Sequence, residues 1–329
     1  MTHTIEIRPS GHTFQVEEGE NILDAALRQG HAFPYGCRGG ACGACKGKVL
    51  EGSVNYGDRQ ARALSGYDKE NGMALFCLAM PEQDMVIEMK EISSAKELQA
   101  KTLPCRVAKM ERLADDVMRI YLKLPAVERA QFLAGQYLDI LLKDGRRRSF
   151  SMANPPHDDE LIELHIRRVD GGEFTRHVFE EMKEKDLLRI ELPLGNFYFR
   201  EDSDKPIIMM AGGTGFAPIK AIVEHAIAEK TDRKIHIYWG ARDVASLYLS
   251  SLAQSWADEN ENIEFIPVLS DLAEGEVWNG RKGFVHQAID DDFQSLTGYE
   301  VYACGPPVMI EAGQQVFAAK GLSDDNFYA

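Results

Sequence analysis

The sequence predicts three domains of different architecture: an α+β domain, an antiparallel β-barrel, and an α/β domain with a doubly wound parallel sheet. One observation is length, because 329 residues exceed what a single hydrophobic core usually organises. The other is a change of pattern, from a mixed first segment to short strand-like runs and then to alternating strands and helices. The predicted boundaries are residues 1–93, a linker at 94–102, then 103–202 and 203–329.

The first segment combines a hairpin with a helix. Residues 4–8 alternate between polar and apolar side chains, and a second short run at 13–16 follows the Ser10-Gly11 turn. This pattern predicts two strands joined in a hairpin. Residues 21–27 carry apolar side chains at helical spacing, and Gly30 stands where such a helix would be capped.

The second segment consists of short β-like runs. Turns such as Asp144-Gly145 separate them, and this regularity is typical of a barrel or a sandwich. The expected strands are 117–124, 136–142, 148–152, 161–169 and 187–192. Residues 94–102, which precede this segment, are polar and lack a core pattern, so they are predicted to form the linker.

The third segment alternates strands with helices. Residues 207–211 are all apolar, as in a strand buried on both faces, and a helix-like stretch at 218–229 follows a glycine-rich turn. Later strand-like runs are 234–239, 263–268 and 300–304. The alternation predicts a doubly wound parallel sheet.

Charge and hydropathy narrow the class of protein. A net charge of −15 provides no basic face for phosphates, so nucleic acid is not an expected partner. The acidic surface is either a uniformly solvated face or, in part, a steering surface for a basic protein. No run reaches the ~18 consecutive apolar residues of a membrane helix, and the N-terminus lacks the pattern of a signal peptide. We therefore expect a cytoplasmic protein without a membrane span.

Four of the six cysteines have a metal-ligand spacing, Cys37-x4-Cys42-x2-Cys45, followed after 31 residues by Cys77. This is the plant-type [2Fe–2S] spacing, in which four thiolates hold two irons and nearby glycines let backbone N–H groups turn toward sulfur. The alternative is a structural zinc, but such sites usually pair one CxxC with another or with histidines. Cys105 lies outside the pattern and is expected in a core.

The second segment carries a candidate flavin motif, Arg148-Ser149-Phe150-Ser151. An arginine can pair with phosphate, an aromatic ring can lie against a flavin, and a serine can hydrogen-bond a ring nitrogen. A plain surface strand is the alternative. Residues 165–169 and the turn at 171–175 follow, and a glycine turn with a hydroxyl at a helix N-terminus is a place for a pyrophosphate.

The third segment carries a candidate nucleotide motif at residues 212–218, Gly-Gly-Thr-Gly-Phe-Ala-Pro. It follows a buried strand and opens a helix, so a diphosphate can approach its backbone. It matches neither GxGxxG nor a P-loop, and a tight structural turn is the alternative. Cys304-Gly305-Pro306-Pro307 ends a later strand, so both motifs should face one cleft. Cys304 is either on the nicotinamide side of that cleft or a buried core thiol.

In this order the three motifs resemble the ferredoxin–NADP reductase superfamily, in the branch with an N-terminal β-grasp ferredoxin domain, over essentially the whole chain. The flavin motif RxYS of that superfamily matches 148–151 with Phe150 at the tyrosine position, and its GGTGxxP and CGPP match 212–218 and 304–307. Within the branch the chain resembles the CDP-6-deoxy-Δ3,4-glucoseen reductases, on residues 134–137 and 283–288. Reductase components of phenol and methane monooxygenases share the domain order.

The resemblance implies FAD in the barrel and NADH in the last domain, with NADPH as the alternative because Arg242 can meet a 2′-phosphate. Residues implied to hold FAD are Arg148, Ser149, Phe150, Ser151, His165, Ile166, Arg167, Gly172, Phe174 and Thr175. Residues implied to hold the nucleotide are Gly212, Gly213, Thr214, Gly215, Pro218, Arg242, Cys304, Gly305 and Pro306. Ser151 and Cys304 are the catalytic candidates, beside the contact of flavin and nicotinamide.

The implied function is electron transfer from NADH through FAD and the cluster to a partner protein, a dehydrase or an oxygenase, that docks near residues 36–46. The alternatives are a flavin or ferric reductase without a protein partner, and a redox sensor. Members of this branch commonly continue past the last residues of this chain to an aromatic that shields the flavin. We therefore expect either a truncated end or another role for Phe327 and Tyr328.

Overall fold

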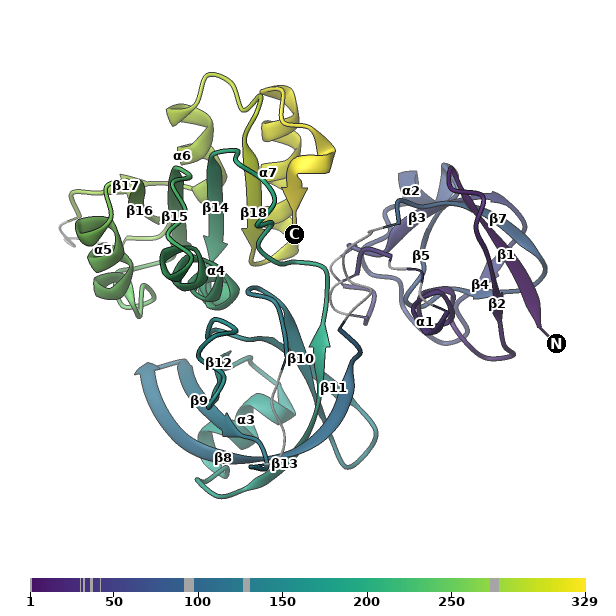
Figure 1. Ribbon diagram of the computed structural model, residues 1–329, viewed down its shortest axis with the longest axis horizontal. Helices are drawn as coiled ribbons and strands as arrows, with labels where there is room; N and C mark the ends of the chain where they lie inside the picture. The colour runs from purple at the N-terminus through teal and green to yellow at the C-terminus, as the bar shows by residue number, and fades with distance from the viewer. Residues whose placement is uncertain are drawn as a thin grey trace. The chain divides into compact units, whose positions relative to one another are not determined.

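The computed structural model describes residues 2–29, 31, 33–35, 38–41, 43–91, 98–126, 131–272 and 278–329. The chain forms two compact units, residues 1–99 and 100–329 (Figure 1). Gly30, expected to cap a helix, and residues 94–97 of the expected linker lie outside the described residues.

The N-terminal unit is a mixed five-stranded sheet with a helix against it. Strand β7 is the central strand and pairs parallel with β1 and antiparallel with β3, while β1 pairs antiparallel with β2. The sheet order is β2-β1-β7-β3-β5, and two short strands, β4 and β6, pair separately. The strands are β1 His3–Arg8, β2 Thr13–Val16, β3 Lys46–Glu51, β4 Val54–Asn55, β5 Met73–Leu75, β6 Met80–Pro81 and β7 Met85–Glu88. This is the β-grasp arrangement, and the predicted hairpin is confirmed.

Helix α1 (Ile22–Arg28) begins after a side-chain cap. The Asn21 side chain caps the helix by accepting a hydrogen bond from the Asp24 N–H at 2.8 Å. Its apolar residues are buried in the unit's core, which confirms the helix predicted at 21–27. A short helix, α2 (Gly66–Glu70), is capped by Ser65 and Asp68.

Residues 101–194 form a six-stranded antiparallel sheet that curls into a barrel. Its order is β11-β10-β13-β8-β9-β12, and a bridge between Met152 and Leu164 joins the ends of its two outermost strands. This closure identifies a barrel rather than a sandwich. The elements are β8 Lys101–Ala114, β9 Val117–Lys123, β10 Tyr137–Leu141, β11 Arg147–Ser151, β12 Ile162–Arg167, α3 Glu173–Glu180 and β13 Leu187–Leu194.

The longest barrel strand, β8, was not expected from the sequence, and it corrects the end of the linker. Lys101 and Thr102 were assigned to the linker but pair with Leu192 and Glu191 of β13. Their polar side chains are exposed, so they carry no hydrophobic signal. Backbone hydrogen bonds to β13, which is distant in the sequence, hold these two residues in the sheet. The local sequence pattern does not reveal a pairing of this kind.

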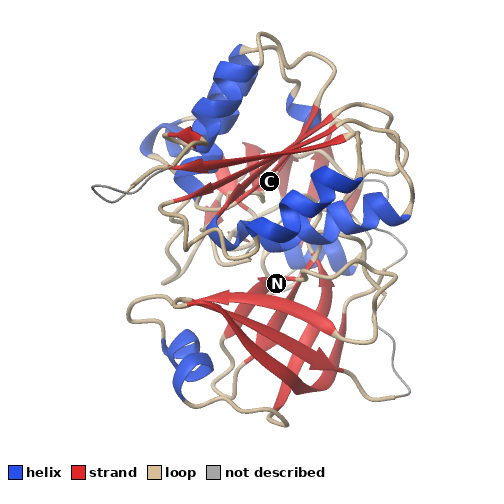
Figure 2. Cartoon of the chain, turned by 90° about the vertical axis from the view of Figure 1, so that its left-hand side faces the viewer, coloured by secondary structure: helices blue, strands red, loops and turns tan. Residues whose placement is uncertain are grey.

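The C-terminal part of the second unit is a parallel sheet with helices on both faces (Figure 2). Its order is β17-β16-β15-β14-β18-β19, so the chain moves outward from β14 in both directions and confirms the doubly wound prediction. The strands are β14 Ile207–Gly212, β15 Ile235–Ala241, β16 Ile263–Leu269, β17 Arg281–Lys282, β18 Glu300–Cys304 and β19 Phe327–Tyr328. The helices are α4 Phe216–Ala228, α5 Ser250–Glu259, α6 Val285–Asp292 and α7 Pro307–Ala319.

Alternate side chains of β14 enter two different cores. Met209 and Ala211 join a cluster with α4 and α5, whereas Ile208 and Met210 join one with α6 and α7. Because β14 is buried on both faces, its sequence is an unbroken apolar run. Among the helices in the described part of the chain, none is both long and apolar enough to span a lipid bilayer.

The last residues of the chain complete the sheet. Phe327 and Tyr328 form β19, paired with Val301 and Tyr302 of β18. The Tyr328 ring lies 4.8 Å from that of Tyr302, centroid to centroid. These two aromatic residues therefore have a structural role at the sheet edge.

Candidate functional site

One cavity of about 1000 Å³ lies in the second unit, between the barrel and the parallel sheet. Barrel strands β11 and β12 with the start of α3 form one side, and the carboxyl ends of β14, β15 and β18 form the other. Its volume is at the upper end of the usual range for ligand pockets. The lining includes Arg148, Ser149, Phe150, Ser151, His165, Arg167, Gly172, Phe174, Thr175, Gly212, Gly213, Thr214, Gly215, Arg242, Cys304, Gly305 and Pro306.

Two residues of the expected set do not line the cavity. Ile166 has no exposed surface and belongs to the barrel core, because side chains alternate along β12 and its neighbours His165 and Arg167 take the cavity face. Pro218 is buried in the first turn of α4. Its ring helps to start the helix and does not reach the cavity.

The cavity also has lining residues that sequence reasoning did not assign. Gly240 and Ala241 end β15, and Ser270 follows β16. Every carboxyl end of a doubly wound sheet faces the same crevice, so these positions were open to prediction once the strands were placed. Gly171 and Glu173, which belong to the predicted pyrophosphate turn, also line the cavity. The other unassigned lining residues are Arg146, Val169, Ala217, Gly283, Phe284, Val285, His286, Val308, Met309 and Ala312.

Strand β11 is held by a buried carboxylate. The Ser149 hydroxyl donates to Asp139 at 2.6 Å, and Asp139 is 1% exposed. This hydrogen bond fixes the orientation of the strand, so the side chains of Arg148 and Phe150 are held on its opposite face. The Phe150 ring lies 5.7 Å from that of Phe174, centroid to centroid, at the start of α3. These two rings form an apolar wall of the cavity.

The turn before α3 brings backbone close to the cavity. A Cβ on Gly172 would lie 2.6 Å from the Thr175 hydroxyl, so only glycine fits. The Thr175 hydroxyl in turn accepts a hydrogen bond from the Val169 N–H at 3.1 Å. No side chain in the described part of the chain caps this helix or α4. Both helices start at the cavity, so their first N–H groups are available to anionic ligands.

Arg167 connects the barrel with the nucleotide half of the cavity. Its Nε lies 3.1 Å from an Asp116 carboxylate oxygen, and a Cβ on Gly213 would lie 2.7 Å from its Nη1. Its Nη2 is buried and has no hydrogen-bond partner among the described residues. A buried guanidinium nitrogen without a partner is costly, and a phosphate in the cavity would satisfy it.

The glycine turn after β14 is shaped by close contacts. Gly213 has φ of +55°, and its carbonyl accepts a hydrogen bond from the Trp239 Nε1–H at 3.0 Å. A Cβ on Gly215 would lie 2.0 Å from the Cys304 carbonyl oxygen. The Phe216 ring stacks on Trp239 with centroids 3.8 Å apart. The turn therefore lies directly against the end of β18, at the point where the strand order reverses.

Cys304 lies at the end of β18 and lines the cavity. Burial raises the pKa of the Cys304 thiol to about 12. The side chain is therefore a neutral thiol at physiological pH and is not an activated nucleophile. What it offers a ligand is shape and a weakly polar sulfur.

A buried ion pair joins the two halves of the second unit. Lys220 of α4 lies 3.0 Å from the Glu163 carboxylate of β12, and Lys220 and Glu163 are each 5% exposed. Lys220 also donates to the Ala153 carbonyl at 3.1 Å and to Glu224 at 2.8 Å. All three ammonium protons thus have acceptors, which a buried lysine requires. We call Glu163 and Lys220 the interdomain ion pair.

His165 extends this network toward the nucleotide half. Burial lowers the pKa of His165, so its ring is neutral near pH 7. A carboxylate only accepts, so His165 Nε2 donates to Glu163 at 2.9 Å and Nδ1 accepts from the Tyr248 hydroxyl at 3.1 Å. Burial raises the pKa of Glu163, but the His165 bond and the Lys220 charge outweigh it and lower that pKa to about 2. Both ring nitrogens of His165 are thus engaged within the protein.

Two of the four cysteines predicted to hold the cluster lie in the described part of the N-terminal unit. Cys45 and Cys77 are 2% and 3% exposed, and the Cys45 carbonyl accepts a hydrogen bond from the Phe76 N–H at 3.1 Å. Pairing of β3 with β5 thus brings cysteines from distant parts of the sequence together. Cys37 and Cys42 lie outside the described residues, as does Gly36 at the start of the expected docking face.

The loop around the described cysteines fits a cluster. Gly40 and Gly43 have φ of +73° and +79°, the left-handed region that favours glycine. A Cβ on Gly40 would lie 2.4 Å from a Leu78 side-chain carbon. The loop backbone therefore packs closely against Leu78, the neighbour of Cys77 in the sequence.

Three family models match the chain in succession. A 2Fe-2S iron-sulfur cluster binding domain matches residues 5–82, an oxidoreductase FAD-binding domain matches 104–199, and an oxidoreductase NAD-binding domain matches 209–315. These matches show that the chain carries a [2Fe–2S] cluster binding domain, an FAD-binding domain and an NAD-binding domain.

Similar proteins match the chain over nearly their whole length. The chain is 38% identical to the CDP-6-deoxy-L-threo-D-glycero-4-hexulose-3-dehydrase reductase of Yersinia pestis, over 100% of this chain and 98% of the relative. It is 35% identical to reductase component 1 of the Comamonas terephthalate 1,2-dioxygenase, over 100% and 97%. The solved structure of the Amycolatopsis reductase GcoB is 33% identical, with a TM-score of 0.79 over 99% of this chain and 97% of that one.

Removing one partner of the interdomain ion pair is expected to destabilise the second unit strongly. Lys220→Met leaves the Glu163 carboxylate buried beside no ammonium group, a loss of roughly 3–5 kcal/mol in the free energy of unfolding. Denaturant titration of the variant and the wild type measures it. Adding Glu163→Gln removes the more deeply buried of the two carboxylates that Lys220 contacts and should recover a large part of the loss.

A matched control is Lys234→Met, which removes an exposed pair with Glu264 whose atoms lie 3.7 Å apart. Exposed pairs contribute about 0–1 kcal/mol. If Lys220→Met costs no more than this control, the buried pair does not stabilise the unit.

Gly215→Ala is expected to weaken nucleotide binding, because its Cβ would meet the Cys304 carbonyl oxygen at 2.0 Å and push the glycine turn away from β18. Overpacking of this kind costs about 1–3 kcal/mol, and NADH titration should show a loss of affinity of that size. Gly66→Ala is the control, since no atom lies within 4 Å of its added Cβ. Equal NADH affinity in both variants would contradict the assignment of this turn.

Proposed function

Because the chain belongs to the family of reductases that join a [2Fe–2S] ferredoxin-type domain to FAD-binding and NAD-binding domains, we propose that it supplies electrons to a dehydrase acting on a CDP-linked 4-hexulose. The observation that carries its reductase role is the single cavity shared by the FAD-binding barrel and the end of the NAD-binding sheet. As the place of the reaction we propose the cytoplasm, where thiolates stay reduced and available to iron.

The reaction is electron transfer from NADH by way of FAD and the [2Fe–2S] cluster to a partner protein. Bound FAD supplies the exchange between a two-electron hydride donor and a one-electron cluster. The chain's own task is to bind both dinucleotides in one cavity, to orient them and to keep water away from their contact.

For FAD we propose the barrel side of the cavity. The uncapped N-terminus of α3 and the guanidinium groups of Arg148 and Arg167 would hold its diphosphate. The Arg167 Nη2, which has no hydrogen-bond partner among the described residues, supports this assignment. Phe150 would cover one face of the flavin ring, and Ser151, at the end of β11, would offer its hydroxyl to a ring atom.

For the nicotinamide nucleotide we propose the sheet side. The uncapped N-terminus of α4, reached through the turn Gly213–Gly215, favours a diphosphate, and Arg242 at the end of β15 adds a positive charge. Cys304 and Ser151 both line the cavity from opposite sides. We propose that they flank the contact between nicotinamide and flavin, where a neutral thiol of Cys304 allows close approach.

Arg167→Met is expected to lower FAD affinity at least about tenfold, since hydrogen bonds to charged groups contribute roughly 1.5–3 kcal/mol. FAD released from purified protein, measured per chain, reports the effect. The adjacent Arg168 gives a matched control because its guanidinium is 45% exposed and pairs with Glu180 on the surface. Equal FAD content in Arg167→Met and Arg168→Met would remove Arg167 from the site.

The choice of a sugar dehydrase as partner rests on the similarity to the Yersinia pestis dehydrase reductase. A second candidate is the oxygenase of a ring-hydroxylating system, which the similarity to the terephthalate dioxygenase reductase favours. Both partners need single electrons, so the reductase chemistry does not separate them.

Reconstitution separates the two candidate partners. We expect NADH-dependent turnover of a CDP-6-deoxy-4-hexulose with a purified dehydrase, and none of an aromatic substrate with a terephthalate-type oxygenase. Cys45→Ser should abolish the dehydrase-coupled reaction by removing a cluster ligand, while Cys105→Ala, in the barrel core, should keep it. Turnover with the oxygenase but not with the dehydrase would overturn the choice of partner. Dehydrase-coupled turnover by Cys45→Ser would contradict the proposal that electrons pass to the partner from the [2Fe–2S] cluster.

A further inference from the structure

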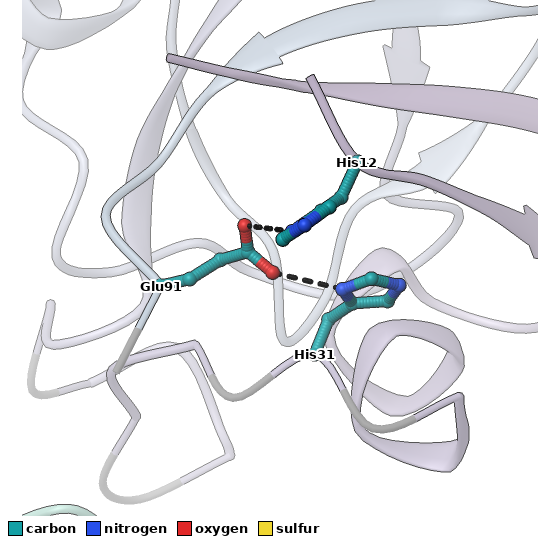
Figure 3. A group of neighbouring side chains, drawn as sticks. All are labelled: His12, His31 and Glu91. Carbon is teal, nitrogen blue, oxygen red and sulfur yellow. Dashed lines mark hydrogen bonds and ion pairs between the residues drawn. The ribbon is translucent and has the colours of Figure 1, made fainter. Parts of the chain in front are cut away.

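Away from the cavity, three side chains of the N-terminal unit converge on one point to which electron transfer assigns no role. His12, His31 and Glu91 come from distant parts of the sequence and face one another (Figure 3). Nδ1 of His12 lies 2.8 Å from one oxygen of the Glu91 carboxylate, and Nδ1 of His31 lies 2.8 Å from the other. The three donor atoms all lie within 4.8 Å of one another.

Backbone hydrogen bonds hold both histidines in place. His12 precedes β2, and its carbonyl accepts a hydrogen bond from the Ile7 N–H of β1 at 2.8 Å. His31 follows α1, and its N–H donates to the Ala26 carbonyl at 2.9 Å. Each imidazole therefore projects from a segment that is tied to a rigid element, as a preformed ligand set requires.

The carboxylate is positioned by the central strands. The Met89 N–H donates to the Arg8 carbonyl at 3.2 Å, which continues the pairing of β7 with β1 past the end of β7. The chain then carries Glu91 alongside the hairpin. Burial raises the pKa of Glu91, but hydrogen bonds from Ser10, His31 and His12 lower it below its usual value overall, so the group is an anion at neutral pH.

Two imidazole nitrogens and a carboxylate oxygen are donors that zinc and other divalent first-row transition metals bind. At zinc bond lengths of about 2.0–2.1 Å, tetrahedral donors lie about 3.3 Å apart. The two 2.8 Å contacts would therefore lengthen by about 0.5 Å, and donor atoms as far as 4.8 Å apart would approach by up to about 1.5 Å. The side chains of His31 and Glu91 are 17% and 19% exposed, and that of His12 is 59% exposed. An ion can thus enter from the His12 side, and water can complete its coordination.

We propose that His12, His31 and Glu91 form a zinc site, separate from the [2Fe–2S] cluster. For nitrogen and oxygen donors the Irving–Williams order places zinc above ferrous iron. Zinc replaces the imidazole protons that now bond the carboxylate, and it ties together the β1–β2 hairpin, the segment after α1 and the end of β7. Because His31 precedes Cys37 by six residues, the ion anchors the start of the cluster-binding segment.

The test is zinc binding by the untagged holoprotein, with cluster and FAD in place. Protein cleared of loose metal by a chelating resin is dialysed against buffered Zn²⁺ at neutral pH, and zinc and iron are counted per chain. We expect one zinc beside the two irons of the cluster. His12→Ala and Glu91→Gln should each lower zinc affinity at least about tenfold, because each removes one of only three protein ligands.

The matched control is His177→Ala, which removes a histidine that pairs with a single carboxylate, that of Glu181, at 2.9 Å. It should bind zinc like the wild type. X-ray absorption at the zinc edge should show two imidazoles and no sulfur. Sulfur ligation would place the zinc on the cysteines of the [2Fe–2S] site. A zinc content of His12→Ala equal to that of the wild type would mean that His12, His31 and Glu91 only hydrogen-bond to one another. Either result overturns the proposal.

Discussion

The interdomain ion pair between Glu163 and Lys220 is the interaction on which the geometry of the cavity depends. Interfaces between domains of one chain are usually polar enough to allow relative movement. Here a lysine on the first nucleotide-side helix is buried against a carboxylate on a barrel strand, and neither charge can leave its partner without a large desolvation penalty. The FAD side and the nucleotide side of the cavity are therefore held at one separation, which hydride transfer requires.

Close backbone contacts position the other parts of the site. Gly215 lies against the carbonyl of Cys304, which places the start of α4 beside the end of β18. The two uncapped helix N-termini, α3 and α4, then face one cavity from opposite sides. A site with two anion-binding helix ends suits two dinucleotides, and FAD and NAD(H) each carry a diphosphate.

Much of this architecture was predictable from the sequence because the relevant signals are local. The apolar run of β14, the glycine turn after it and the alternation in β11 each depend on a few neighbouring residues. Contacts between distant residues were not predictable. Lys101 and Thr102 have no strand pattern and belong to β8 only through pairing with β13. Nothing in the sequence around Lys220 indicates that this lysine is buried in an ion pair with Glu163. His165 was assigned to FAD by position, and only the fold reveals that Glu163 and Tyr248 engage its ring nitrogens.

The most direct test of this account is the rate at which NADH reduces bound FAD in the double variant Glu163→Gln/Lys220→Met, measured by rapid mixing at saturating NADH. Removing both charges avoids leaving the buried Glu163 carboxylate without its ammonium partner but releases the constraint between barrel and sheet. The account predicts retained FAD with a reduction rate about 10- to 100-fold below wild type, as a misplacement of about 1 Å produces. A double variant that binds FAD and is reduced at the wild-type rate would contradict it.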